Sequence, residues 1–238
     1  MSARPGSFDP VRVIRRTAET EFEVVVRPRA RRGKSLPLPN RLLSHFLDHF
    51  CKASGVEVEP RRTSWPGSWR LDHVLCEDLG QLVGKGIAGI HAALRATSGV
   101  AGRGRASCVM DDALVEVTLS LEGRPRAEWA LEGVGDVDGL VDGWYDDHDR
   151  LAGFATGTNL RQFVDGFAHG AGATVQVTAR RAGNLHHFYE ALFRALGDAV
   201  REALGLTCGR LPGDGSGLAG ECSYDVAPES TEDEAHRA

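Results

Sequence analysis

Three features that would place a chain in a specialised class are missing from this sequence. No stretch approaches the roughly 18 consecutive apolar residues of a membrane-spanning helix, and residues 1–10 contain no apolar core of a secretory leader. The five cysteines form no CxxC pair, and their odd number argues against a disulfide framework. The net charge of −5 gives no reason to expect nucleic acid as a partner. We therefore expect a cytoplasmic protein that binds neither membranes nor nucleic acid.

The composition that remains is that of an ordinary globular protein. The chain has 238 residues, of which 42% are hydrophobic and 26% are charged, enough for one large domain or two small ones. Residues 207–238 are rich in glycine, proline, serine and acidic residues and lack apolar periodicity, which predicts a disordered acidic tail. Residues 1–10 are predicted to be a loose N-terminus.

The chain resembles itself in two places. The segment LSHFLDHF at 43–50 is similar to LRQFVDGF at 160–167. Downstream of these lie LDHVLCEDLGQLVGKGI at 71–87 and NLHHFYEALFRALGDAV at 184–200. Two similar motifs in the same order, at nearly the same separation, predict a duplicated unit.

The duplication predicts two halves of the same construction, at 11–104 and 105–206. Alternating apolar residues predict strands at 21–28, 57–62, 113–123 and 173–181. Helical periodicity predicts helices at 40–53, 76–96, 159–170 and 186–204. Each half then reads strands, helix, strand, helix, which predicts an α+β fold with helices packed on one face of each sheet. No element is predicted within the glycine- and aspartate-rich connection 133–158.

Each downstream segment carries a histidine and a glutamate four residues apart. In an ungapped alignment His73 matches His186, and Glu77 matches Glu190. Residues i and i+4 share a helix face, so each pair can reach one point, and imidazole with carboxylate suits Mn²⁺, Zn²⁺ or Fe²⁺. His187 projects about 100° away from His186, so the second segment is predicted to contribute to two sites.

Two cation sites follow if the halves pack with twofold-like symmetry. The first predicted site holds His45, His186 and Glu190. The second holds His73, Glu77, His187 and Gln162. A single His–Glu pair on a helix is more often a weak surface pair, so the repetition is what favours metal binding here.

Six short motifs resemble those of the imidazoleglycerol-phosphate dehydratase family. They are RRTAETE (15–21), SHFLDH (44–49), HVLCED (73–78), VMDDAL (109–114), EGRP (122–125) and NLHHFYEALFRA (184–195). The matches run in family order from about residue 11 to 205, and the ordered set is more specific than any one of them.

The resemblance implies a fold, an assembly and a reaction. The fold is a tandem duplication of a ribosomal-S5-domain-2-like unit. The assembly is a symmetric homo-oligomer built from trimers, with active sites at subunit contacts. The reaction removes water from the small molecule imidazole glycerol phosphate, in histidine biosynthesis. Two manganese ions bind the imidazole, a glutamate moves a proton, and basic side chains clamp the phosphate.

Carried over position by position, the resemblance assigns roles to residues of this chain. Glu19 matches the catalytic acid–base. The implied metal ligands are His45, His73, Glu77, His186, His187 and Glu190, with Gln162 in place of a family histidine. The implied substrate-binding residues are His49, Arg103, Arg124 and Arg194.

The chain departs from the family pattern at the metal ligands. Val74 replaces one ligand histidine and Gln162 another, so each metal has lost one expected ligand. His49, one turn after His45, is a candidate to compensate.

Three functions stay open. The first is a dehydratase, acting on the family substrate or, as a paralogue, on another hydroxylated compound. The second is a non-catalytic assembly protein with a decayed metal site, and the third is a hydrolase that uses the metals to activate water.

Overall fold

The computed structural model describes residues 9–28, 38–64, 71–131, 134–205 and 211–214. The loose N-terminus predicted at 1–10 and the tail predicted at 207–238 lie almost entirely outside the described residues. Within the described ranges, no helix combines the length and the apolar character needed to cross a membrane.

The first part of the chain forms a three-stranded antiparallel sheet and two helices. Its elements in chain order are β1 (Val11–Arg16), β2 (Glu21–Pro28), α1 (Arg41–Ser54), β3 (Val56–Ser64) and α2 (Asp72–Thr97). The strand order is β1-β2-β3. Strand β2 buries every second side chain, so that Phe22, Val24 and Val26 enter the core. Helix α1 begins after Asn40, whose side chain accepts from the Leu43 N–H.

The second part repeats this order and adds strands to it. Its elements are β4 (Arg103–Met110), β5 (Ala113–Ser120), β6 (Arg126–Ala130), β7 (Leu140–Tyr145), β8 (Leu151–Thr156), α3 (Gly157–Ala171), β9 (Thr174–Ala182) and α4 (Leu185–Ala203). One sheet has the order β4-β5-β9-β6, and β7 pairs with β8 in a separate ribbon. The predicted α+β class is confirmed, and all four predicted helices are present. The duplication and its boundaries stay predictions.

The connection 133–158, for which no element was assigned from the sequence, contains β7 and β8. Two register shifts, at Leu140/Asp142 and at Trp144/Tyr145, interrupt the pairing of these strands. A bulge breaks the two-residue alternation by which a strand is recognised from sequence. The ribbon therefore has no clear periodic signal.

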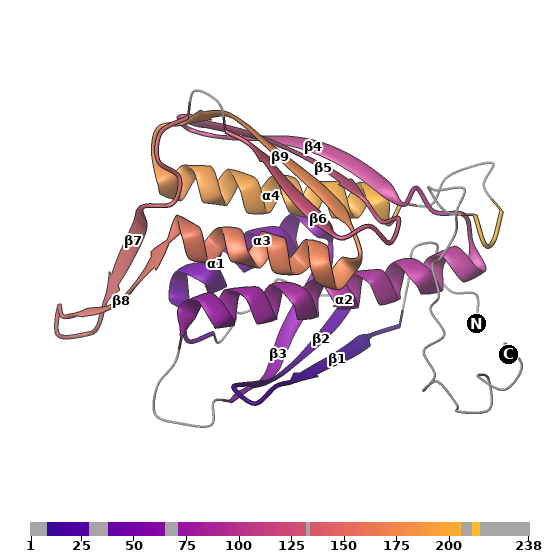
Figure 1. The fold of residues 1–238 in the computed structure, drawn as a ribbon, viewed down its shortest axis with the longest axis horizontal. Helices are drawn as coiled ribbons and strands as arrows, with labels where there is room; N and C mark the ends of the chain where they lie inside the picture. Colours follow the sequence, from indigo (N-terminus) through magenta and orange to yellow (C-terminus); the bar gives the residue numbers. More distant parts are fainter. Residues whose placement is uncertain (1–8, 29–37, 65–70, 132–133, 206–210, 215–238) are drawn as a thin grey trace, which may run out of the picture.

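The two sheets form the outer layers of the molecule and the four helices lie between them (Figure 1). Helix α2 contacts β1 and β2, and α4 contacts β4 and β5. Helices from the two parts pack against each other, α1 against α4 and α2 against α3. Each sheet is thus covered by helices on one face, as predicted, and the core extends across both halves.

Two glycines at equivalent positions of the repeated segments allow close packing of α2 against α3 and of α4 against α1. A Cβ atom on Gly84 of α2 would lie closer than 3.0 Å to the Phe167 carbonyl oxygen of α3. A Cβ atom on Gly197 of α4 would meet the Phe50 carbonyl oxygen of α1 at 2.6 Å. Gly84 aligns with Gly197, and Phe50 with Phe167, in the repeated segments. The same close contact between backbones is therefore made twice.

Candidate metal centre

The first turn of α4 is positioned by Asn184. Its side-chain oxygen accepts from the backbone N–H of His186 at 2.8 Å and of His187 at 3.3 Å, which satisfies two amides at the helix start. The helix therefore begins at Leu185, and His186 lies one turn before Glu190.

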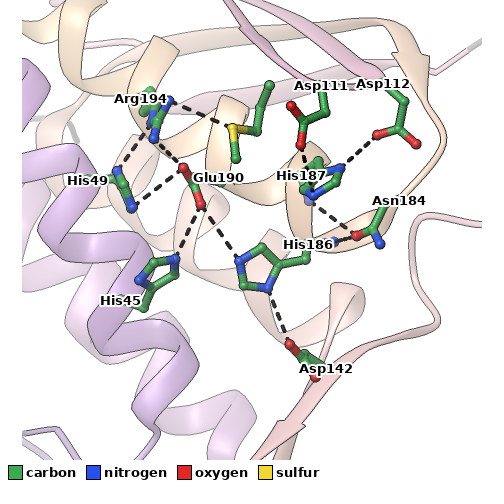
Figure 2. Close-up of polar contacts among 11 residues, drawn as sticks. His45, His49, Asp111, Asp112, Asp142, Asn184, His186, His187, Glu190 and Arg194 are labelled. Carbon is green, nitrogen blue, oxygen red and sulfur yellow. Dashed lines mark hydrogen bonds and ion pairs between the residues drawn. The ribbon is translucent and has the colours of Figure 1, made fainter.

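Glu190 is the centre of a cluster between α4 and α1, and its two carboxylate oxygens face different partners (Figure 2). Oε2 lies 3.3 Å from Nε2 of His45 and 3.7 Å from Nε2 of His186. Oε1 is paired with Arg194 and lies 3.5 Å from Nε2 of His49. Burial disfavours the charged carboxylate, but the surrounding groups, among them Arg194 and the hydrogen bond to His45, outweigh burial and hold the pKa of Glu190 below its ordinary value.

His49 differs from the other two histidines because Arg194 occupies one of its ring nitrogens. The Nε–H of Arg194 donates to Nδ1 of His49 at 3.1 Å. Burial lowers the pKa of His49 to about 4, so its ring is neutral and carries one proton. An arginine N–H cannot accept, so that proton is on Nε2 and faces Glu190. In this arrangement the protonated Nε2 of His49 lies on the side of the Glu190 carboxylate, 3.5 Å from Oε1.

The geometry around Glu190 fits a divalent cation. One ligand atom each from His45, His49 and Glu190 lies within 4.8 Å of the other two. On the Oε2 side, the imidazole nitrogens of His45 and His186 converge on an anionic oxygen, a donor set that suits Mn²⁺ and related cations. Because His49 is bonded to Arg194, the Oε2 side is the better position for the ion.

His187 faces away from Glu190 and toward the turn between β4 and β5. Its Nδ1 lies 2.9 Å from Asp112, and its Nε2 lies 3.4 Å from Asp111. The hydrogen bond to Asp112 raises the pKa of His187. The sequence reasoning did not assign these two aspartates a role, although the VMDDAL motif contains both.

The other predicted ligands lie on the opposite pair of helices. Glu77 of α2 and Gln162 of α3 line a shallow cavity of about 340 Å³. The Gln162 Oε1 atom is buried and has no hydrogen-bond partner within the described part of the chain. His73 is exposed one turn before Glu77. One chain therefore brings Glu77 and Gln162 to one cavity, while His187 is held elsewhere.

Glu19 lies in the exposed turn between β1 and β2, which is tied to α2 by a buried carboxylate. Asp78 accepts hydrogen bonds from Thr20 and from Arg15, both at 2.6 Å. Burial raises the pKa of Asp78, although Thr20 and Arg15 oppose the shift. Sequence reasoning did not identify Asp78, the neighbour of Glu77, as the anchor of the Glu19 turn.

The three arginines expected to bind substrate are not gathered in one place. Arg194 is part of the Glu190 cluster. Arg103 is exposed at the start of β4, and Arg124 is exposed before β6, where its carbonyl accepts from Thr174. Neither is among the contacts of the Glu190 cluster in the described residues. A phosphate clamp made from all three is not formed within one chain.

Comparison with known proteins gives one consistent result. The family model described as imidazoleglycerol-phosphate dehydratase matches residues 39–200. The chain is similar to proteins of that name from Deinococcus radiodurans, at 30% identity over 84% of this chain and 94% of the relative, and from Deinococcus deserti, at 28% identity with the same coverage. The structure is similar to that of the Pyrococcus furiosus protein of that family, with a TM-score of 0.61 and 25% identity over 82% of this chain and 95% of the other.

Proposed function

Because the chain belongs to the imidazoleglycerol-phosphate dehydratase family, we propose that it removes water from imidazole glycerol phosphate, or a closely related phosphorylated compound, at a dinuclear manganese centre. As a member of this family it is a hydro-lyase. The proposal concerns the substrate, the metal and the residues that bind them.

The observation that carries the proposal is the surroundings of the Glu190 carboxylate. It is 4% exposed, and its Oε2 faces two imidazole nitrogens, those of His45 and His186. Oε2 is hydrogen-bonded to Nε2 of His45, and two imidazole nitrogens beside a carboxylate oxygen form a donor set that suits a divalent cation. We assign the first metal to His45, His186 and Glu190.

The second metal is assigned to residues that one chain does not assemble. Glu77 and Gln162 share a cavity, and Gln162 Oε1 has no hydrogen-bond partner among the described residues. His73 lies one turn away on α2, and we propose that His187 of another copy completes the set. This assignment requires the symmetric homo-oligomer, built from trimers, that the resemblance to the family implies.

The chain's own residues supply the remaining chemistry. Divalent cations bound by these residues would supply a Lewis acid that withdraws electron density from the imidazole of the substrate. Glu19, on the turn anchored by Asp78, takes the proton from the carbon beside the ring and returns one to the leaving hydroxyl. Arg194 neutralises Glu190, and we propose that it also binds the phosphate, with Arg103, Arg124 and His49 as further substrate contacts.

The test is a dehydration assay with imidazole glycerol phosphate on manganese-loaded protein, with metal content measured on the same sample. We expect turnover and close to two metals per chain. Glu19→Gln should lower kcat by at least about 100-fold with metal content and oligomer size unchanged. Full metal content without turnover would indicate the paralogue with a changed substrate.

The second candidate is a non-catalytic assembly protein, which Val74 and Gln162 favour because neither offers an imidazole to a metal. Metal content separates the two functions. Less than about half an equivalent per chain after expression with added manganese would support decay of the site, because metal binding weakens when ligands are lost.

A further inference from the structure

A carboxylate lies behind the ring of His186. Oδ2 of Asp142, in β7, is 3.3 Å from Nδ1 of His186, the ring nitrogen opposite the one that faces Glu190 (Figure 2). We propose that Asp142 is a positioning residue that fixes His186 as a cation ligand. The inference rests on the first metal site proposed above.

The chemistry follows from the single proton of a neutral imidazole. A carboxylate accepts and does not donate, so Asp142 favours the tautomer of His186 with its proton on Nδ1. Nε2 then keeps its lone pair, and this is the nitrogen 3.7 Å from Glu190 Oε2. Carboxylates placed behind metal-binding histidines in this way fix the ring and raise its basicity.

His49 provides the opposite case within the same cluster. Its Nδ1 accepts from the Nε–H of Arg194, so its Nε2 carries the proton. The group that contacts Nδ1 of each ring thus determines whether Nε2, on the side of Glu190, carries the proton. Asp142 leaves Nε2 of His186 free to bind a cation, whereas Arg194 leaves Nε2 of His49 protonated and unable to bind one.

The Asp142 carboxylate is itself held in place. Its Oδ1 accepts from the backbone N–H of Gly143 at 2.7 Å, which leaves Oδ2 toward His186. Asp142 belongs to the β7–β8 ribbon, which Figure 1 shows beyond the N-terminal ends of α3 and α4. The described residues of the first half contain no such ribbon, so this support is specific to His186.

The variant that tests the proposal is Asp142→Asn. The amide oxygen keeps the bond to the Gly143 N–H, so the amide nitrogen faces His186 and donates to Nδ1, which reverses the tautomer. Isothermal titration of metal-free protein with MnCl₂ should show affinity at the tighter site lowered by about 10–100-fold. Asp147→Asn removes the same charge from the same ribbon without touching His186 and should leave affinity within about twofold.

A second measurement needs no variant at position 142 and no metal. Nitrogen-15 NMR of the histidine rings in the wild-type metal-free protein should show His186 protonated on Nδ1, with the signal assigned by its loss in His186→Gln. An Nε2-protonated His186, or equal manganese affinity in Asp142→Asn and the wild type, overturns this inference and leaves the proposed metal centre standing. Absence of manganese binding by the wild type overturns both.

Discussion

The His–Glu pairs of α2 and α4 have the same spacing and very different surroundings. Glu190 of α4 is 4% exposed and contacts His45, His49 and Arg194. Glu77 of α2 is exposed and accepts a hydrogen bond from Gln81 on its own helix. One pair is enclosed by side chains of the same chain, and the other is open to a surface cavity.

The difference comes from what each helix face meets. The face of α4 that carries Glu190 packs against α1, which presents His45 and His49 one turn apart. The face of α2 that carries Glu77 lies beside α3, where Gln162 occupies the place matched to His45. Spacing therefore sets which residues share a face, and the opposing helix determines whether that face forms a complete site.

The largest expected effect is the loss of activity when either carboxylate is replaced, and only one of the two replacements should also lower stability. Glu190→Gln and Glu77→Gln should each lower kcat/KM by more than about 100-fold if both sites serve one reaction. Only Glu190→Gln should also destabilise the fold, by about 1–3 kcal/mol, because the partly buried Arg194 loses its carboxylate. Steady-state kinetics and urea unfolding measure the two effects. Full activity in Glu77→Gln would show that the open site has no role in the reaction.

The next effect is a loss of stability when the contacts between α2 and α3 or between α1 and α4, the helices that carry the two His–Glu pairs and their opposing residues, are disturbed. Gly84→Ala and Gly197→Ala should each destabilise the protein by about 1–3 kcal/mol, because the added methyl group meets a carbonyl oxygen of the opposing helix. Thermal unfolding should show both losses, at about 2–4 °C for each kcal/mol. Gly55→Ala is not a suitable control because that glycine has φ 73°, whereas Gly135→Ala has open space around its Cβ. A loss of stability in only one of the two variants would show that the two helix contacts are not equivalent.

A smaller gain should follow from restoring a ligand at the open site. Gln162→His places an imidazole where Oε1 is buried without a partner in the described residues. We expect the weaker manganese site to bind about tenfold more tightly, with the tighter site unchanged. Calorimetric titration of the oligomer distinguishes the two sites. An unchanged weak site would show that Gln162 does not face the second metal.

The smallest expected effect is a pH dependence of stability that arises from His91 in α2. Burial lowers the pKa of His91, and Arg95 adds to the shift. The unfolded chain therefore takes up a proton near pH 6.5 that the folded chain resists, so stability falls as pH drops below that value, by at most about 1.4 kcal/mol per pH unit. His91→Leu should flatten the stability curve between pH 7 and 5. Parallel curves would contradict this assignment.

Much of the fold could be predicted from the sequence because its signals are local. Helical periodicity and strand alternation located all four helices and β2, β3, β5 and β9. Among the strands that were not predicted, β7 and β8 have a pairing that two register shifts interrupt. Strand β6 pairs with β9, which is remote in the sequence, so no local pattern reveals its partner.

The candidate site was predicted less completely. The spacing of His186 and Glu190 and the upstream position of His45 suggested one shared site, and these three groups lie together in the structure. Asp78, Asp112 and Asp142 were not anticipated as partners of functional residues, since their contacts join elements remote in sequence. His49 was assigned to substrate, and its bonds to Arg194 and toward Glu190 were not foreseen.

The sequence by itself determined the α+β class, the family and which residues share each helix face, because periodicity and residue spacing act over a few turns of one element. Only the tertiary structure decided that Glu190 is enclosed and Glu77 is open, and which ring nitrogen of each histidine is available. Those properties depend on which helices are in contact and on which charged group lies beside each histidine ring. These groups are remote in the sequence, and only folding brings them within hydrogen-bonding distance.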